Sequence, residues 1–539
     1  MKKITKYILT AGLGISALTM SSCEKDFLDI NTDPNNPTDV PVRQLLPAVE
    51  LSVANSTSIA NGTSSSTAFM MHHLVTRGNL NDYIMLPSAF TPNSVWNSLY
   101  LDALTDINVI IEKGTADGDL HYVGIAKILK GYIYSILVDY YGSVPFETAN
   151  LGAINSSPQF AGGAAIYNEV FALIDAGIAD LAATSVLSPG NDDLFYGGNR
   201  ANWRKFAKTL KLKLYNQIRL VEDVSAEVNA LIQEGDLISS PAEDFQMQYG
   251  TSQAPDDRNP TYASEYAPGT HSYISPYFYE VMTNQNTFGH NGNIFPTSDP
   301  RVPYYFYNQI NVAAGEEPEN PTAYFNNATG FLSIYQFSFN IDPNEGFDQA
   351  SSQTVVGLYP CGGRFDAGDG ATANFNGVGN TPHRILTYFD RLYIEAELIN
   401  AGVIAGDEAA ATEAAIRASF AKVNEVAADA GAPLISAAAI NNYVTNVMGV
   451  FNGGNATERL QVIMTQKWIA SFGNASDIYN DWRRTGYPIL HDGNTDNLAV
   501  TVRSRDFIQS FPYPQRELDL NSNAPSQKNI YSAKVFWDN

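Results

Sequence analysis

Aromatic rings beside amide side chains are the residues of this sequence whose types and spacing could do chemistry, and that chemistry is ligand recognition. A sugar presents an apolar face of C–H groups and a rim of hydroxyls, so its site needs a flat ring with amides or carboxylates at the edge. Such combinations occur at residues 93–97, at residues 79–83 and between residues 262 and 307. The candidate ligand contacts are Trp96, Tyr273, Tyr277 and Tyr304 as stacking rings and Asn79, Asn81 and Asp82 as edge partners. For each ring taken singly, core packing is the competing interpretation.

Reactive groups that would indicate an enzyme do not converge in the sequence. The chain contains no G-x-S-x-G, H-E-x-x-H, C-x-x-C, P-loop or G-x-G-x-x-G motif. Glu395 and Glu397 stand two residues apart on a predicted helix, where they face different directions, unlike the facing carboxylates of a glycosidase. We therefore expect binding without catalysis, and interpret His72 and His73 as structural.

One loop offers ligands for a metal ion. Asp342, Asn344 and Asp348 place hard oxygen donors on a turn, and calcium accepts such donors. The glycine of this loop stands one place early for an EF-hand, and the bidentate glutamate is missing. Calcium at these three residues is the single cofactor candidate.

Acidic residues dominate the charge of the chain. The sequence holds 32 Lys and Arg against 56 Asp and Glu, a net charge of −24. Such a surface repels phosphate backbones, which argues against nucleic acid as a partner. The few basic clusters are therefore expected to form internal ion pairs. They are Arg483 with Arg484, and Arg204, Lys205, Lys208, Lys211 and Lys213.

The N-terminus has the form of a lipoprotein export signal. Three lysines within the first six residues precede an apolar stretch, residues 7–20, that is too short to span a bilayer. Two serines then lead to Cys23, so residues 1–22 are predicted to be removed and Cys23 acylated. Residues 23–41, rich in Pro and Asn, are predicted to be a tether. A plain signal peptide with an unmodified Cys23 is the alternative.

Helical periodicity dominates both flanks of the remaining body, residues 42–539. Apolar residues recur three and four positions apart at 125–141, 166–181, 206–218, 385–399 and 460–472. Between about 240 and 382 these stripes fade, and residues 262–307 alone hold eight Tyr and four Phe. We expect a mainly α fold, with tetratricopeptide-like helical pairs at 42–239 and 383–539 and a loop-rich, aromatic-rich ligand lobe at about 240–382. The lone Cys361 is interpreted as a buried structural cysteine.

Several strings in this order resemble the SusD/RagB family of nutrient-binding outer-membrane lipoproteins, in particular its second SusD-like subgroup. Besides the lipoprotein start, the strings are YYGSVPF at 140–146, DPR at 299–301, YIEAE at 393–397, QKWIA at 466–470, DWRRTGYP at 481–488 and FPYPQRE at 511–517. The resemblance implies four tetratricopeptide-like pairs and a variable loop-rich face. It also implies that Glu395 and Glu397 pair with basic residues of neighbouring helices.

The resemblance further implies a function. Such a protein is anchored at the outer face of the outer membrane, captures a nutrient, most commonly an oligosaccharide, and sits as a lid over a TonB-dependent SusC-type transporter. Peptide or another glycoconjugate is also possible cargo. The alternative is a membrane-anchored glycosidase or a structural surface protein, and a turnover assay on glycans and peptides separates these classes.

The first prediction concerns the anchor. The mature protein is expected to begin at Cys23 and to carry acyl chains, because each buried methylene contributes about 0.8 kcal/mol and several chains hold a protein on a membrane. Mass spectrometry of the N-terminal peptide measures this directly. An unmodified Cys23, or cleavage at another residue, contradicts the anchor.

Overall fold

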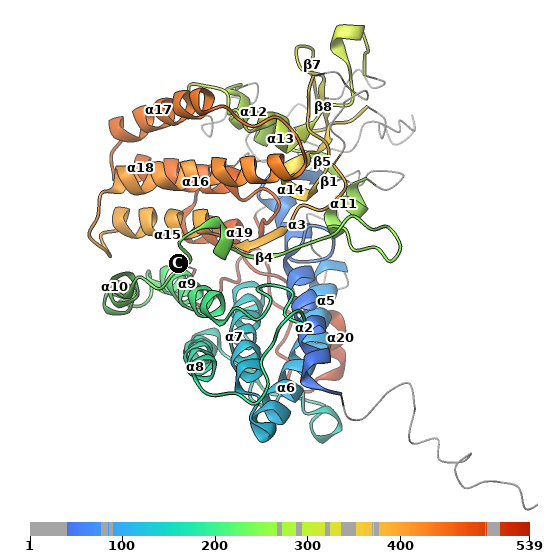
Figure 1. Cartoon of the computed structure of the whole chain (residues 1–539), viewed down its shortest axis with the longest axis vertical. Helices are drawn as coiled ribbons and strands as arrows, with labels where there is room; N and C mark the ends of the chain where they lie inside the picture. Colours follow the sequence, from blue (N-terminus) through green and yellow to red (C-terminus); the bar gives the residue numbers. More distant parts are fainter. Residues whose placement is uncertain are drawn as a thin grey trace, which may run out of the picture.

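The structure is a computed structural model that describes residues 40–76, 85, 90–266, 272–286, 294–318, 324–335, 352–368, 370, 377–490, 492 and 507–538. Within these ranges the chain is predominantly helical, as predicted, and two groups of helices carry a lobe of short strands (Figure 1). None of the helices found there is both long enough and apolar enough to cross a bilayer.

The first group of helices covers the N-terminal flank. Its members are α2 (Val42–Thr57), α3 (Ser64–Met70), α5 (Phe90–Asn97), the π-helix η2 (Ser98–Leu104), α6 (Thr105–Asp117), α7 (Leu120–Tyr141), α8 (Gly163–Ala182), α9 (Arg200–Ile218) and α10 (Ser225–Glu234). The side chain of Asn199 caps α9 by accepting hydrogen bonds from two backbone N–H groups of its first turn. The apolar stripe that predicted a helix at 125–141 lies on α7, which is buried along nearly its whole length.

Two glycines set the distance between α7 and α8. A Cβ atom at Gly124 would lie 2.8 Å from the carbonyl oxygen of Gly177, and one at Gly177 would lie 2.7 Å from the carbonyl oxygen of Gly124. Both distances are shorter than any van der Waals contact, so this crossing requires glycine on both helices. The close approach lets α7 form the central helix of the first group.

The second group covers the C-terminal flank. Its helices are α15 (Tyr388–Asn400), α16 (Glu408–Asp429), α17 (Ala437–Gly453), α18 (Ala456–Ala470), α19 (Ser476–Thr485) and α20 (Gln515–Leu520). Capping boxes begin α15, through Thr387 and Asp390, and α18, through Asn455 and Glu458. Figure 1 shows α15, α16, α17 and α18 stacked beside one another, with α20 on the far side of the molecule against α2 and α5.

Short elements make up the middle of the chain. Its helices are α11 (Pro260–Glu265), α12 (Pro276–Thr283), α13 (Val302–Tyr305) and α14 (Leu358–Cys361), together with the single-turn helices η4 (Pro241–Glu243) and η5 (Val312–Ala314). The strands found in the described residues are β1 (Leu74–Thr76), β2 (Val144–Pro145), β3 (Phe160–Ala161), β4 (Phe245–Met247), β5 (Ser272–Ile274), β6 (Phe306–Tyr307), β7 (Tyr324–Asn326), β8 (Phe331–Ser333), β9 (Val355–Val356) and β10 (His383–Leu386). They form antiparallel pairs, and β1–β5 and β4–β10 join the lobe to the helical flanks.

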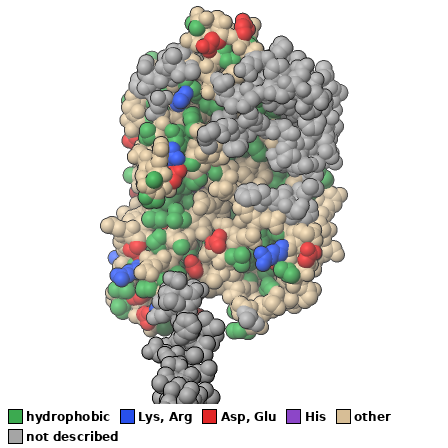
Figure 2. Space-filling view, turned by 90° about the vertical axis from the view of Figure 1, so that its right-hand side faces the viewer, with side chains coloured by type: hydrophobic (Ala, Val, Ile, Leu, Met, Phe, Trp, Pro, Cys, Tyr) green, Lys and Arg blue, Asp and Glu red, His purple; other side chains and the backbone are tan. Residues whose placement is uncertain are grey.

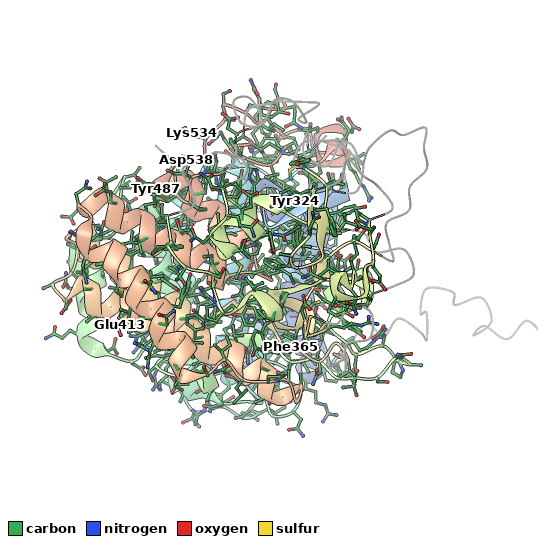
Figure 3. All side chains as sticks on the ribbon, turned by 90° about the horizontal axis from the view of Figure 1, so that it is seen from above. Tyr324, Phe365, Glu413, Tyr487, Lys534 and Asp538 are labelled. Atoms are coloured by element: carbon green, nitrogen blue, oxygen red, sulfur yellow. The ribbon has the colours of Figure 1, made fainter. Side chains whose placement is uncertain are left out.

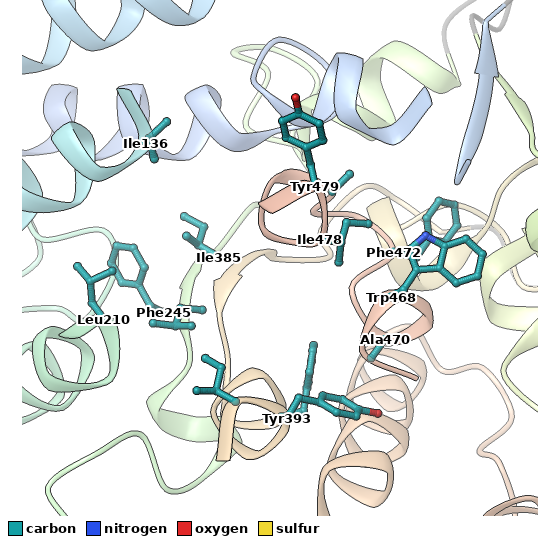
Figure 4. Packing of buried hydrophobic residues seen from close by; sticks show 14 of the residues in the cluster. Ile136, Leu210, Phe245, Ile385, Tyr393, Trp468, Ala470, Phe472, Ile478 and Tyr479 are labelled. Atoms are coloured by element: carbon teal, nitrogen blue, oxygen red, sulfur yellow. The ribbon is translucent and has the colours of Figure 1, made fainter. Parts of the chain in front are cut away.

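One apolar core runs through both groups of helices. Figure 4 shows Ile136 and Leu210 of the first group around the same space as Tyr393, Trp468 and Tyr479 of the second. Phe245 of β4 stacks on Phe206 of α9 with ring centroids 3.7 Å apart. The two flanks are therefore packed against each other rather than joined by a linker.

A buried ionic network crosses the same boundary. The Glu397 carboxylate on α15 accepts hydrogen bonds from Arg219 (2.8 Å) and Asn216 (2.9 Å) of the first group. It also accepts from both Nη atoms of Arg484 on α19. Arg484 in turn donates to Asp481 at 2.7 Å, and Asp481 pairs with Lys467 of α18 at 2.6 Å. Four helices, α9, α15, α18 and α19, thus contribute to one buried network, and three of them meet at the Glu397 carboxylate.

The charges of this network fix the ionisation of Glu397. Burial alone would raise the pKa of its carboxyl, but the positive charges of Arg484 and Arg219 lower that pKa to about 2. The implied pairing of Glu397 with neighbouring basic residues is confirmed, and so is the internal role of Arg484. For Glu395 the implied pairing with a neighbouring helix is wrong, because its partner is Arg391 on its own helix, at 2.7 Å.

The basic cluster of α9 also forms the expected internal ion pairs. Each of its members reaches a carboxylate of a neighbouring segment: Arg204 and Lys208 reach Asp236, Lys205 reaches Glu243, Lys211 reaches Asp175 and Lys213 reaches Asp477. Because all five basic residues are paired, they do not form a basic binding patch on α9.

The second prediction concerns Glu397. Glu397→Gln is expected to lower the free energy of unfolding by about 3–5 kcal/mol, because breaking a buried pair leaves the guanidinium groups uncompensated. Urea unfolding followed by circular dichroism measures the change. Glu395→Gln is the matched control, and losing its partly exposed pair with Arg391 is expected to cost about 1 kcal/mol or less. Equal losses in the two variants contradict the role of Glu397.

The third prediction concerns the pH dependence of the difference in unfolding free energy between the parent and Glu397→Gln. Because the folded pKa of Glu397 lies below its usual value of 4.5, the stabilisation is complete above about pH 4.5 and is lost as the pH falls toward 2. The difference in unfolding free energy between parent and Glu397→Gln, measured from pH 7 to pH 2.5, is expected to stay constant and then shrink. A difference that grows on acidification contradicts the assignment.

Candidate functional site

Two adjoining hollows form a groove between α2, the α5–η2 helix and α20. The larger one, of about 810 Å³, is called here the polar hollow. Its lining consists of Asn55, Ser56, Asn61, Asn93, Ser94, Asn97, Ser98, Asp102, Gln515 and Arg516. The second, of about 390 Å³, is called the apolar hollow, and it shares Asn93, Asn97 and Arg516 with the first. Together the two hollows are called the groove.

Amide side chains dominate the polar hollow. Asn55, Asn61 and Asn97 have no side-chain hydrogen bond to any other residue in the part of the chain that the structure describes. Each amide offers two donors and one acceptor with two lone pairs. The hollow therefore presents hydrogen-bonding groups of both kinds with little charge, which suits a ligand rich in hydroxyls.

Aromatic and aliphatic side chains form the apolar hollow. Trp96 and Tyr100 lie at its base, with 5% and 6% of their surfaces exposed. Leu101, Leu151 and Leu520 stand at its edge and are 58%, 44% and 66% exposed. These exposed leucines form an apolar rim that can cover the C–H face of a ligand.

An unpartnered amide oxygen also lies in the apolar hollow. The Nδ2 group of Asn150 donates to the carbonyl of Tyr100 at 2.5 Å, whereas its Oδ1 is buried without a partner among the described residues. The backbone of Asn150 is left-handed, with φ of 58°. A buried acceptor without a donor costs free energy, so a donor on a ligand would satisfy Oδ1.

The helix at residues 90–117 positions one wall of the groove. α5, η2 and α6 follow one another without a break, and Asn93, Asn97 and Leu101 line the groove at intervals of four residues. Their spacing on one helix face explains why these polar and apolar groups share a wall. The middle of this helix is a π-helix, a conformation frequent at functional sites.

The C-terminal segment supplies the opposite wall. Tyr513, just before α20, packs edge-to-face on Phe160, with ring centroids 5.6 Å apart. Its backbone N–H and C=O are both hydrogen-bonded to the side chain of Gln527, and Asn521 donates to the carbonyl of Pro158 at 3.0 Å. These contacts hold Gln515 and Arg516 over the groove. Figure 2 shows the face of the molecule on which α5 and α20 lie, where charged side chains are few and scattered.

The structure places Trp96 in the groove but gives its ring little access. Its ring is enclosed by Tyr100, Tyr141 and Phe160, with centroid distances of 4.8, 5.0 and 6.4 Å. Trp96 thus forms the floor of the apolar hollow, and its neighbours Asn93 and Asn97 supply the polar edge that the sequence analysis associated with it.

The three candidate tyrosines lie away from the groove, in the core. Tyr273 is fully buried in a small cluster with Val75 and Ile334, while Tyr277 and Tyr304 donate their hydroxyls to the carbonyls of Ile489 and Pro433. Their rings have no exposed face, so their interpretation as stacking rings is corrected to core packing, the competing interpretation. Figure 3 shows Tyr324 and Phe365 of the same lobe near the middle of the molecule, with Glu413 of α16 toward its edge.

Several candidates lie outside the described residues. These are Cys23, Asn79, Asn81, Asp82 and the calcium candidates Asp342, Asn344 and Asp348. Their roles stay predictions. Among the described residues, no cluster of His, Cys, Asp and Glu is arranged to hold a metal ion.

The remaining reactive side chains are structural. Both histidines of the 72–73 pair are buried; His73 Nε2 lies 3.0 Å from the carbonyl oxygen of Trp468, and burial lowers the pKa of His73 to about 3. Burial raises the pKa of the Cys361 thiol, so this cysteine stays protonated. The expected ion pair of Arg483 is wrong: among the described residues its guanidinium donates to the backbone carbonyls of Asp139 and Gln509 and forms no ion pair.

Sequence reasoning missed most of the groove. Asn55, Asn150 and Arg516 were not singled out as ligand contacts, although Arg516 belongs to the string FPYPQRE that contributed to the resemblance. In this string two prolines one residue apart are followed by polar residues, a pattern that indicates an exposed turn. This pattern was the available signal for Arg516 in the sequence.

Comparison with known proteins supports the resemblance. The family model SusD-like_2, described as "Starch-binding associating with outer membrane", matches residues 34–514. No curated protein matches the chain. Among solved structures, a chitin-binding protein superposes with a TM-score of 0.68 at 21% identity, covering 92% of this chain and all of that one.

Two further structures agree. A SusD homologue from Bacteroides fragilis has a TM-score of 0.69 at 17% identity, over 93% of this chain and 99% of its own. A chitin-binding SusD homologue from Flavobacterium johnsoniae has a TM-score of 0.65 at 18% identity, over 92% and 98% of the two chains. Because the family match covers most of the chain and the fold agrees throughout, this protein belongs to the SusD-like family of starch-binding proteins that associate with the outer membrane.

Proposed function

We propose that this protein captures an oligosaccharide at the cell surface and delivers it to a TonB-dependent transporter of the SusC type. The observation that carries the proposal is the groove: unpartnered amides beside an apolar rim, in a chain of a family described as starch-binding. Two solved relatives of similar fold are described as chitin-binding.

The groove matches the two surfaces of a sugar chain. Hydroxyl groups exchange hydrogen bonds with amides at Asn55, Asn61 and Asn97, and the C–H faces rest against Leu101 and its apolar neighbours. Two adjoining hollows of about 810 and 390 Å³ offer room for more than one sugar ring, so this arrangement suits an oligosaccharide better than a monosaccharide.

Delivery requires an anchor and a partner. An acylated Cys23 would hold the body near the outer leaflet through the tether at residues 23–41, and the transporter would lie beneath it. The family's association with the outer membrane supports this arrangement. The ligand would then pass to the transporter unchanged, because we propose capture without catalysis.

Catalysis is the competing class of function. A membrane-anchored glycosidase requires two facing carboxylates, whereas Glu397 is bound by two arginines and Glu395 by one. Incubating the mature protein with any glycan that it binds, followed by chromatography of the products, is expected to return the glycan intact. Product formation would favour the glycosidase.

The fourth prediction tests the groove. Asn97→Ala is expected to weaken binding of the best hit from a glycan array by about 2- to 12-fold, since a neutral hydrogen bond contributes about 0.5–1.5 kcal/mol. Isothermal titration calorimetry measures the affinity. Asn97 is exposed, so the variant should unfold like the parent.

Asn446→Ala is the matched control for this measurement. Asn446 lies on α17, on the opposite side of the molecule from α5 and α20, and its amide bonds only within its own helix (Figure 1). The affinity of the Asn446→Ala variant for the glycan is expected to equal that of the parent. If Asn97→Ala also binds like the parent, the groove is not the site.

A further inference from the structure

We infer that the captured oligosaccharide is acidic, and that Arg516 binds one of its carboxylate groups. This inference rests on the proposed function, and it adds the chemical class of the ligand and the residue that selects it. The geometry that points to it is an arginine without a partner at the junction of the two hollows.

Arg516 lies where the two hollows adjoin. It is the one charged side chain that lines both hollows, and it is exposed. Among the described residues it forms neither a hydrogen bond nor an ion pair. Its guanidinium group is therefore available to a molecule that enters the groove.

The other arginines of this acidic chain show why an arginine without a carboxylate partner is informative. A carboxylate partner is held by each of Arg204, Arg219, Arg258, Arg301, Arg391, Arg417, Arg459 and Arg484. Most of the other described arginines without a carboxylate serve the fold in another way: Arg200, Arg384 and Arg483 donate to backbone carbonyls, and Arg364 lies over the ring of Tyr307. Arg43 of α2 is exposed without a carboxylate among the described residues, as Arg516 is, but it does not line the groove. Arg516 lacks one at the place where a ligand would sit.

The chemistry of guanidinium selects the ligand group. Its N–H donors lie in a planar fork that matches the two oxygens of a carboxylate, and such bidentate pairs are stronger and more directional than neutral hydrogen bonds. In an oligosaccharide, a uronic acid residue supplies that carboxylate. The amides of the polar hollow remain for the hydroxyls on either side.

Two carboxylates limit where the acidic group can bind. Asp102 stands on the η2 wall of the polar hollow, and Glu517 follows Arg516 in the apolar hollow. Glu517 Oε1 accepts a hydrogen bond from Asn521 at 2.7 Å and so faces its own helix. Like charges across the groove penalise a carboxylate anywhere but at the fork of Arg516, so the groove selects the register of the ligand as well as its charge.

Calorimetry with matched probes tests the inference. The probes are oligosaccharides of galacturonate, alginate and hyaluronan, each with its carboxyl-reduced, neutral counterpart, titrated into the mature protein. The parent is expected to bind at least one acidic probe about tenfold or more tightly than its reduced counterpart, as charge-assisted hydrogen bonds allow. Arg516→Gln should lose that preference and keep the affinity for the neutral probe, while Arg516→Lys should retain part of it.

Arg417→Gln serves as the matched control. Arg417 is a partly exposed arginine that pairs with Glu413 on α16, and α16 lies away from α5 and α20, so this variant should bind like the parent (Figure 1). The preference of the parent should also weaken between 50 mM and 500 mM salt, because a partly exposed ion pair is screened.

Three other outcomes of these titrations would contradict the inference, each in a different way. Equal affinity for acidic and neutral probes, or binding of neutral array glycans alone, overturns the acidic ligand and leaves the proposed function intact. A preference that persists in Arg516→Gln overturns the role of Arg516. Binding of no glycan in the array or the probe set overturns the proposed function together with the inference.

Discussion

The carboxylate of Glu397 is the constraint on which the rest of the structure depends. It lies where α9, α15 and α19 meet, is completely buried, and receives hydrogen bonds from Asn216, Arg219 and Arg484. Buried charges are tolerated only when every partner is in place, so these helices can assemble in one arrangement. The network adds specificity to a core that is otherwise apolar and non-directional, and it ties residues that are more than 260 positions apart in the chain.

The groove is a product of the same long-range order. Its walls come from residues 55–61, 93–102 and 515–517, which only the return of the C-terminal segment brings together. That return is fixed on α7, where the N–H of Phe511 donates to the carbonyl of Tyr140 at 2.7 Å and Trp537 Nε1 donates to Asp139 Oδ1 at 2.8 Å. Burial raises the pKa of Asp139 to about 6, while its hydrogen bonds with Tyr167 and Trp537 and the charge of Arg483 act to lower it.

The sequence predicted what local periodicity and charge determine, and failed where distant segments meet. The apolar stripe at 125–141 and the basic residues of α9 became a buried helix and a row of internal ion pairs, because both patterns lie within single helices. The tyrosines at 273, 277 and 304 were misassigned because composition does not tell whether a ring in a loop-rich segment is covered. Asn55, Asn150 and Arg516 could not be brought together without the fold, and only Trp96 with its two asparagines was anticipated.

The π-helix within the groove wall makes this surface tolerant of a change in length. A π-turn carries more residues per turn than an α-helix, so Ser98–Leu104 holds about one residue more than an α-helix of the same rotation. Deleting one residue there would restore α-helical geometry, and α5 would keep its phase relative to α6 and the same row of side chains toward the groove. α6, α7 and the core behind them would also keep their positions. Only the side chains of the turn itself, Asp102 among them, would then shift, so a one-residue deletion would reshape this part of the wall without rebuilding the rest of the groove.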